Sequence, residues 1–273
     1  ATRRTEEVNA PLRHELGDLL FSLGDFDEAV VVRNEELRMY EMAGNIRERA
    51  VTLGRIADLM QAKGKFDDAL KIWSNEVLPI FENIGDDRSR VVAMGRVAVL
   101  LKEQGDVDAA LKIWKEVELP FFENLGDERS KAVILGNIAD ALRTRGDIKE
   151  AFRIRKYEEL PIYEKLGDVR SIAVVMGRIA SILQDRGRFD EALEIRRKQE
   201  LPRYEKIGDM HALSVGRANL AICLAERGLA KDRIEIANLL RQAHSSSVQI
   251  GSPEVDKIAD IFARYVGVPI TDF

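Results

Sequence analysis

Apolar residues recur at steps of three and four positions along most of the chain. The segment RSRVVAMGRVAVLLKEQG (88–105) shows this spacing, and FDDALKIWSNEVLPIFENIG (66–85) keeps it up to and beyond its proline. The spacing is that of an amphipathic α-helix with one buried face. No segment of the sequence alternates like a strand between hairpin turns. The pattern therefore predicts an all-α protein.

Two series of glycines divide the sequence into repeats of mostly 41 residues. The first series opens turns of the type GxFDEA, and most members of the second are followed by aspartate. The two series are Gly24, Gly64, Gly105, Gly146, Gly187 and Gly228, and Gly44, Gly85, Gly126, Gly167, Gly208 and Gly251. Each glycine is expected to end a helix. The repeats are predicted at about 5–44, 45–85, 86–126, 127–167, 168–208 and 209–251, with a capping helix at about 253–266.

Each repeat is predicted to be a pair of helices. The connections between helices are two to four residues long, so neighbouring helices must run antiparallel. A single pair cannot cover its own apolar faces, and the pairs are therefore expected to stack side by side. Four aspartates that follow the second glycine series are expected to accept hydrogen bonds as N-caps of the next helix. These residues are Asp86, Asp127, Asp168 and Asp209.

The stretch LGDLLFSLGDFDEA (16–29) carries the clearest copy of the motif. Its Leu-Gly pair, turn glycine, following aromatic residue and alanine in the second helix resemble the tetratricopeptide repeat. The 41-residue period resembles the longer variety found in kinesin light chain, Pins and the sensor domain of the bacterial maltose activator. This resemblance implies a right-handed superhelical α-solenoid, here of six helix pairs plus a capping helix, as one solenoid over residues 1–273. It also implies that the first helices line a concave groove for a peptide, a protein segment or a sugar.

Four prolines fall inside the second helices of the repeats. They are Pro79, Pro120, Pro161 and Pro202, and the repeats that carry them have one residue more between their two glycines than the first repeat. A proline inside a helix removes a hydrogen bond and clashes with a preceding carbonyl. An added residue allows the helix to bulge or break there. We predict a kinked second helix; an exposed recognition elbow is the alternative.

The candidate binding residues lie on the first helices. Glycine recurs in mid-helix at Gly54, Gly95, Gly136 and Gly177, where it costs about 1 kcal/mol relative to alanine, so something is expected to approach the backbone there. By resemblance, the polar residues beside these glycines form a row that holds a partner, and arginine can grip a carboxylate with two hydrogen bonds. The predicted partner-binding set is Arg55, Arg96, Asn137, Arg178 and Asn219, with the acids Asp58 and Asp140.

The alternative for this row is that its arginines form ion pairs within the protein. Arg55 has Asp58 three residues further along the same helix, which is a favourable spacing for an ion pair. Arg96 and Arg178 have no acidic residue three or four positions away. These two are therefore the stronger candidates for ligand contacts, unless a neighbouring helix supplies an acid.

Trp73 and Trp114 occupy equivalent positions in two second helices, where other repeats have Arg33, Arg155 and Arg196. The usual place for such an aromatic residue is the seam between repeats. The arginines suggest that the position reaches solvent. An exposed tryptophan pair on the convex side is therefore the alternative, as a partner contact or as a contact between copies of the chain.

Composition and charge limit the function classes. The formal net charge is -5 and the pI about 5.5, which argues against nucleic-acid binding. No apolar run is long enough to cross a bilayer and no leader is visible. The sequence lacks phosphate-loop, zinc-binding and nucleophile-elbow motifs. Cys223 is expected to be a core residue, and the histidines are too scattered for a metal site. We predict no enzyme activity, no cofactor, no membrane contact and a cytoplasmic location.

The predicted function is a scaffold for protein interactions. Its concave groove is expected to bind an acidic peptide or protein segment, as the sensor or docking part of a larger bacterial protein. A small-molecule sensor is a second hypothesis, which the valines on the first helices disfavour. A homo-oligomeric structural scaffold is a third.

Overall fold

A computed structural model describes the backbone of residues 2–267 and 270, and side chains from residue 11 onward within that range. The described residues are mostly helical and contain no strand, which confirms the all-α solenoid fold. The chain divides into two compact units, Ala1–Asp127 and Glu128–Phe273. Each unit is described by itself, so a single solenoid over the whole chain stays a prediction.

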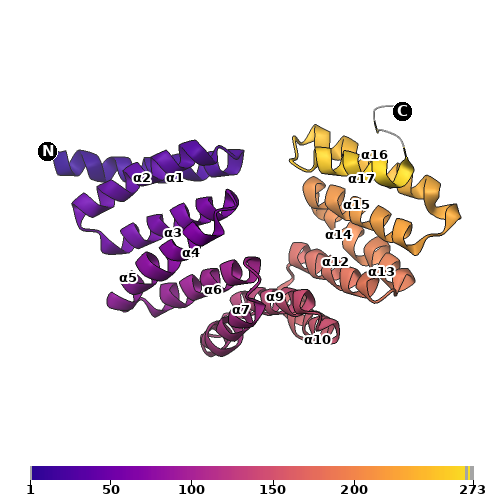
Figure 1. The fold of residues 1–273 in the computed structure, drawn as a ribbon, viewed down its shortest axis with the longest axis horizontal. Coiled ribbons are helices and arrows are strands. Elements are labelled where there is room, and N and C mark those ends of the chain that lie inside the picture. Colours follow the sequence, from indigo (N-terminus) through magenta and orange to yellow (C-terminus); the bar gives the residue numbers. More distant parts are fainter. Residues whose placement is uncertain (1, 268–269, 271–273) are drawn as a thin grey trace. The chain divides into compact units, whose positions relative to one another are not determined.

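Three helix pairs make up the described part of the first unit, and their helices run antiparallel to one another (Figure 1). In each pair, the first helix is one continuous segment. The second helix is continuous in the first pair and consists of three consecutive segments in the other two. The elements are α1 (Thr2–Leu23) with α2 (Phe26–Ala43), α3 (Ile46–Ala62) with α4 (Phe66–Lys71), η1 (Ile72–Val77) and α5 (Leu78–Asn83), and α6 (Asp87–Glu103) with α7 (Val107–Ile113), η2 (Trp114–Glu118) and α8 (Leu119–Asn124).

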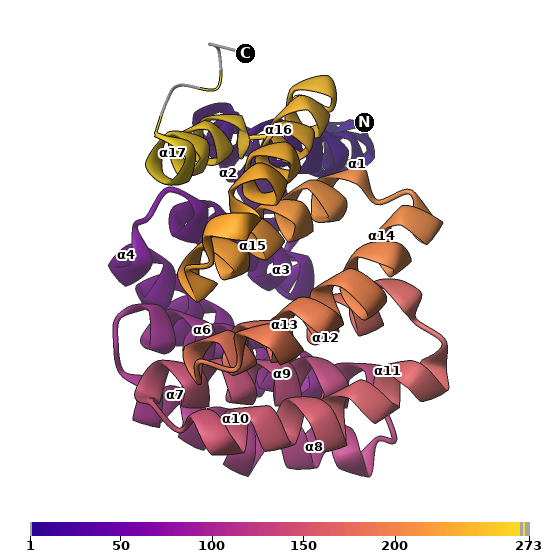
Figure 2. The same cartoon turned by 90° about the vertical axis from the view of Figure 1, so that its right-hand side faces the viewer.

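The second unit contains three more pairs and a closing helix in its described part. Figure 2 shows the segments of one second helix, α13 and α14, following one another along a single rod. The closing helix packs on the last pair. The elements are α9 (Glu128–Arg145) with α10 (Ile148–Ile154), η3 (Arg155–Glu159) and α11 (Leu160–Leu166), α12 (Val169–Asp185) with α13 (Phe189–Ile195), η4 (Arg196–Glu200) and α14 (Leu201–Ile207), α15 (Met210–Arg227) with η5 (Ala230–Asp232) and α16 (Arg233–Gln249), and α17 (Val255–Val266).

The added residue in each proline-containing helix is taken up by a π-helical segment. The four segments η1, η2, η3 and η4 each end immediately before a Leu-Pro pair. In the first pair, which has no such proline, α2 is uninterrupted. The wider turn absorbs the extra residue beside the proline, whose ring would otherwise clash with a carbonyl. The predicted bulge is confirmed. The chain stays helical on both sides of each proline, so it does not open into an elbow.

At the turns of the second glycine series, a glycine ends one helix and the following aspartate begins the next, as predicted. Gly167 ends α11 with a φ of 65°, in the left-handed region that glycine adopts without strain. The side chain of Asp168 then accepts a hydrogen bond of 3.0 Å from the backbone N–H of Ser171. Asp86 and Asp209 cap α6 and α15 in the same way. These caps begin the next first helix.

Ion pairs at a 41-residue interval link these capping aspartates to the preceding repeats. An arginine in the first turn of one first helix reaches the aspartate that directly precedes the next first helix. The pairs within the two units are Arg47–Asp86 (3.2 Å), Arg88–Asp127 (2.9 Å), Arg129–Asp168 (2.8 Å) and Arg170–Asp209 (2.7 Å). Sequence reasoning missed this ladder, although the arginines have the period of the repeat. The arginines are exposed, so each pair contributes little by itself.

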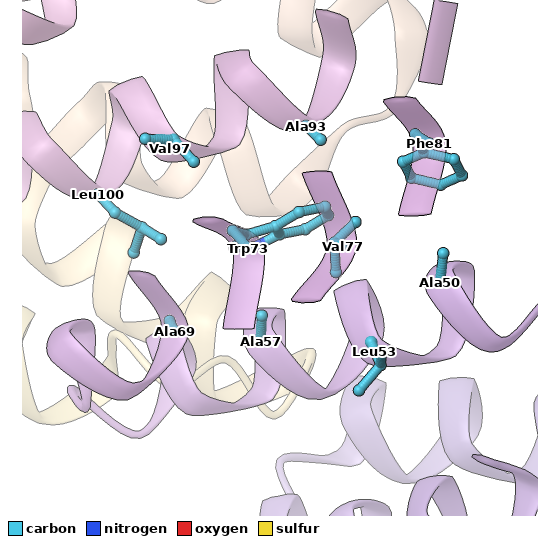
Figure 3. Packing of buried hydrophobic residues seen from close by; sticks show 10 residues of the cluster. All are labelled: Ala50, Leu53, Ala57, Ala69, Trp73, Val77, Phe81, Ala93, Val97 and Leu100. Atoms are coloured by element: carbon cyan, nitrogen blue, oxygen red, sulfur yellow. The ribbon is translucent and has the colours of Figure 1, made fainter. Parts of the chain in front are cut away.

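The glycines in the middle of the first helices make room for side chains of the second helices. A Cβ atom on Gly54 would lie 2.6 Å from Cη2 of the Trp73 indole. Figure 3 shows this ring in a core of small and branched residues between α3 and α6. A Cβ on Gly95, by comparison, would overlap the carboxylate of Glu118. The groups that approach these glycines therefore belong to the protein itself, and the glycines alone do not indicate a ligand.

This packing predicts different effects of two matched substitutions. Gly54→Ala is expected to lower the free energy of unfolding by about 1–2 kcal/mol, since overpacking against the rigid indole ring costs about 2–3 kcal/mol, the upper part of the usual range, and the gain in helix propensity returns about 1. Gly95→Ala is expected to change it by less than about 1 kcal/mol, because the end of the Glu118 side chain can move. Urea denaturation followed by circular dichroism measures both. Equal losses would contradict this account of the glycines.

Candidate functional site

The predicted row lies on the first helices α3, α6, α9, α12 and α15. Arg55, Arg96 and Arg178 are exposed, and the two asparagines are half-buried. Four residues before each member of the row stands a valine, and Val92 and Val174 are also exposed. Residues four apart share one face of a helix. Each of these first helices therefore presents a polar group beside an apolar one.

The three arginines of the row carry no ion pair with any residue that the structure describes. Arg55 makes none with Asp58, although the spacing would allow it, and Oδ1 of Asp58 has no hydrogen-bond partner. Other arginines, such as Arg47 and Arg170, pair with a neighbouring acid. No described residue thus occupies the guanidinium groups of the row with an ion pair, and these groups are available to a ligand. Whether they bind one stays a prediction.

In the first unit, two members of the row line a cavity of about 560 Å³. Arg55, Arg96 and Asp58 are among the residues that line it. The Oδ1 atom of Asp58 is buried and accepts no hydrogen bond. Burial raises the pKa of this carboxyl, and the positive charges of Arg96 and Arg55 partly oppose that effect. The cavity thus combines two unpaired cations with an unsatisfied acceptor.

The reason for the unsatisfied oxygen lies in the facing second helix. In the first repeat, the acid at the equivalent position, Asp18, pairs with Arg33. In the fourth repeat, Asp140 accepts a hydrogen bond of 2.5 Å from Nη2 of Arg155. In the second repeat the facing residue is Trp73, which cannot serve as a counter-ion. Of the two acids in the predicted set, Asp58 faces a cavity and Asp140 is held by the protein's own arginine.

The second unit has a smaller cavity beside the row, of about 310 Å³. Arg178 and Asn219 line it from two first helices, together with Tyr204 and His211. Burial, supported by the nearby charge of Glu200, raises the pKa of Tyr204 to about 12, so its hydroxyl is a hydrogen-bond donor at neutral pH. Asn137 lies on α9 of this unit and is not among the residues that line either cavity.

The two tryptophans are buried in the seam between helices, with exposed fractions of 8% for Trp73 and 1% for Trp114. The alternative of an exposed pair on the convex side, for a partner or for a second copy, is therefore wrong. The equivalent arginines do not reach solvent either. They are 1–3% exposed and each pairs with a buried glutamate of its own helix. The pairs are Arg33–Glu36, Arg155–Glu159 and Arg196–Glu200.

Glu118 is a buried acid that lacks this arginine. It occupies the position of Glu159 and Glu200, but Trp114 stands where those residues have their partner. Its Oε2 atom accepts no hydrogen bond, and the residue is 9% exposed. Burial raises the pKa of Glu118 to about 7, against an opposing effect of Arg96. Sequence reasoning missed this group, although the third repeat keeps the glutamate and has a tryptophan in place of the arginine four residues before it, which is a signal for it.

The remaining candidate chemistry gives no site. Cys223 is fully buried, as expected for a core residue, and burial raises the pKa of its thiol. His211 pairs with Glu254 at 3.0 Å. Among the described residues, no group of three or more histidine, cysteine or acidic side chains is arranged to hold a metal ion. None of the helices described is long and apolar enough to cross a membrane.

No family model and no curated protein sequence matches the chain. Solved structures resemble it closely in fold. A Rap protein complexed with the Competence and Sporulation Factor shares 17% identity, with a TM-score of 0.68 over 97% of this chain and 75% of that one. Aspartyl phosphate phosphatase F from Bacillus subtilis shares 12% identity, with a TM-score of 0.74 over 97% and 71%.

A third neighbour is a signal-transduction ATPase of the STAND class from Pyrococcus horikoshii, which has a tetratricopeptide repeat sensor. It shares 14% identity with a TM-score of 0.70, and the likeness covers 97% of this chain and 43% of that one. Identities this low show the fold and leave the function open. The helix pairs, their turn glycines and these neighbours together give the protein the fold of the tetratricopeptide repeat family.

Proposed function

We propose that this protein is an interaction scaffold that binds a peptide or protein segment along its first helices. The row Arg55, Arg96, Asn137, Arg178 and Asn219 supplies hydrogen-bond donors, and the valines beside it supply apolar contacts. The segment carries acidic side chains, which the guanidinium groups bind with two hydrogen bonds each. Another structure of similar fold, the Rap conjugation gene regulator of the plasmid pLS20, has been solved in complex with the Phr* peptide, and it supports this assignment by analogy.

The observation that carries the proposal is the cavity of the first unit. Arg55 and Arg96 line it without an ion pair to any described residue, while Asp58 leaves one buried oxygen without a donor. A group with a carboxylate for the arginines and an N–H for Asp58 satisfies all three. A peptide offers both kinds of group, since its backbone N–H lies a few ångströms from an acidic side chain.

A phage-displayed library of random peptides tests the proposal with the full chain as bait. We expect the recovered peptides to be enriched in aspartate and glutamate. Arg55→Glu/Arg96→Glu is expected to weaken the best peptide at least about tenfold, because the charge of both donors is reversed. The affinity should also fall as salt is raised, since exposed charges are screened. Fluorescence anisotropy with a labelled peptide measures both effects.

The matched control is Lys112→Glu/Lys115→Glu. It makes the same change in net charge on exposed positions of the second helix in the third repeat. This variant should bind the peptide as the parent chain does, and both variants should keep the parent's helical circular dichroism. Recovered peptides without acidic enrichment, or equal weakening by both variants, would show that the row is not the binding site.

A small polar ligand is the second candidate, because the volume of the first-unit cavity lies within the range of about 300–1,000 Å³ that small-molecule sites occupy. Its charged lining suits a small carboxylate. A thermal-shift screen of small carboxylic and amino acids distinguishes the two. A ligand that raises the midpoint of the parent but not of Arg55→Glu/Arg96→Glu, with no peptide recovered, favours this candidate.

The proposal also covers the setting of the array. We place it in the cytoplasm as the sensor or docking part of a larger bacterial protein. The STAND neighbour supports this arrangement by analogy, because there the repeats are the sensor of a longer chain of which this one spans 43%. Limited proteolysis of the protein purified from its source, followed by mass spectrometry, would reveal the attached domains.

A further inference from the structure

The helix α1 presents a stripe of leucines to solvent. Leu12, Leu16 and Leu19 are 62%, 45% and 55% exposed, and their spacing of four and three residues places them on one face. The opposite side of α1 packs on its partner helix, where Gly17 lies against the Arg33 side chain. The stripe is therefore a second apolar face that α2 does not cover.

The same positions are buried in later repeats of each unit. Leu12, Leu16 and Leu19 precede the turn glycine Gly24 by 12, 8 and 5 residues. On α3, α6, α12 and α15, the residues at the same distances before their turn glycines are at most 9% exposed. The corresponding side chains that are buried in this way include Ile56 and Leu59, Ala93, Val97 and Leu100, Val175, Ile179 and Ile182, and Leu220 and Cys223. These three positions of a first helix thus form a contact surface in the later repeats, and α1 carries apolar residues at all three of them.

The structure also shows what covers this surface where it is buried. On α6, the stripe Ala93, Val97 and Leu100 packs against one second helix of the preceding repeat (Figure 3). That helix contributes Ala69, Trp73 and Val77, which recur every four residues. The natural partner of the stripe is therefore an amphipathic helix with apolar residues at positions i, i+4 and i+8, among them a small one.

Two further features mark the α1 stripe as a contact surface. Leu23 extends the stripe and is 65% exposed, while later repeats place polar residues at its position, such as Lys63 and Gln104. At the other end of the sequence, α17 buries Ile258 and Phe262 and turns polar residues such as Lys257 outward. The closing helix thus covers its apolar face, whereas α1 exposes one and even enlarges it.

We propose that the α1 stripe, Leu12, Leu16, Leu19 and Leu23, is a docking surface for a partner helix with the chemistry of the array's own second helices. A second copy of α1 fits less well. Where first and second helices meet in the array, small residues face large ones, as Gly54 faces Trp73, and the stripe offers leucine alone. A helix with a small residue among its apolar positions approaches these leucines closely, as α4 and η1 approach α6.

A fusion supplies such a helix in the correct register. Residues 45–85 of this chain, the second repeat, are placed directly ahead of Thr5, in place of residues 1–4. In the parent chain this repeat stacks on α6, and in the fusion a copy of it is expected to stack on α1 in the same way. We expect the thermal midpoint to rise by at least about 5 °C. Leu16→Lys should remove this gain in the fusion, while changing the midpoint of the parent chain by less than about 2 °C, because the parent exposes Leu16.

Val248→Lys is the control, since Val248 is similarly exposed on α16 of the other unit. It should shift parent and fusion equally. A fusion without a raised midpoint, or a gain that survives Leu16→Lys, would overturn the proposal. Sedimentation of the unfused chain provides a separate check. A dimer that Leu16→Lys dissociates would mean that a second copy, and not a partner helix of this type, covers the stripe.

Discussion

Glu159→Val is expected to lower the free energy of unfolding by about 3 kcal/mol or more, the usual loss when one member of a buried ion pair is removed. Arg155 and Glu159 are 3% and 4% exposed, and Nη1 of the arginine donates to Oε2 of the glutamate at 2.6 Å. Without Glu159, the buried guanidinium keeps only Asp140 and the carbonyl of Gly136 as partners. Its Nε atom already donates no hydrogen bond.

The chain itself offers the compensating change. The second repeat has Trp73 and Val77 at the positions of Arg155 and Glu159, and both are buried there. Arg155→Trp/Glu159→Val is therefore expected to recover most of the loss and to come within about 1–2 kcal/mol of the parent, since a well-packed apolar pair often replaces a buried ion pair at little cost. Gly136 leaves space for the ring, as Gly54 does for Trp73.

Urea denaturation followed by circular dichroism measures both variants, and the midpoint and slope should be compared at one protein concentration. The informative quantity is the interaction between the two substitutions, which a double-mutant cycle with Arg155→Trp alone isolates. An unchanged midpoint for Glu159→Val would show that the ion pair does not hold the seam together. Losses that simply add in the double variant would show that the apolar pair is no substitute in this repeat.

Glu118 is expected to make the protein less stable as the pH rises from about 4.5 to about 7. Burial raises the pKa of this carboxyl from 4.5 to about 7, although Arg96 opposes the shift. Between these values the folded protein binds a proton that the unfolded chain has released, so the stabilisation present below pH 4.5 is lost as the pH approaches 7. At 1.36 kcal/mol for each pKa unit, the full effect is about 3 kcal/mol.

Glu118→Gln removes the ionisable group and keeps its shape. We expect this variant to unfold at a higher urea concentration than the parent at pH 8 and at a similar one at pH 5. Glu200→Gln is the control, because Glu200 carries the charge that Arg196 needs, with Nη1 to Oε2 at 2.9 Å. The control should be less stable than the parent at pH 8. A difference between parent and Glu118→Gln that is the same at both pH values would contradict the assignment.

The repeat pattern of the sequence predicted the local structure well. Helix spacing, turn glycines and capping aspartates are local features, and each acts through the backbone of its own segment. Even the π-helical segments followed from a local count, because one added residue accompanies each proline. These predictions held because the same short-range constraints recur in repeat after repeat, so that every copy supports the interpretation of the others.

The seam between helices could not be predicted in the same way. An arginine at the position of Trp73 suggested access to solvent, but the structure buries Arg33, Arg155 and Arg196 beside glutamates. Whether a charged side chain is buried depends on the counter-ion that packing brings to it, and no single residue type reveals that. The glycines likewise indicated a close approach to the backbone, but only the packed helices identified the approaching groups as Trp73 and the glutamates.

Periodicity and turn chemistry act over a few residues, so the sequence was enough to predict a series of helix pairs with a row of polar residues at one position of the first helices. The packed helices were needed to show which acidic groups near that row have a counter-ion. Asp140 accepts a hydrogen bond from Arg155 on the facing helix. Asp58 has Trp73 at the equivalent facing position, and Glu118 has Trp114 in place of the arginine four residues before it, so each of these two acids keeps an oxygen without a donor. The physical reason is that pairing and burial depend on residues that the fold brings together from different helices, about 15 to 20 positions apart in the chain.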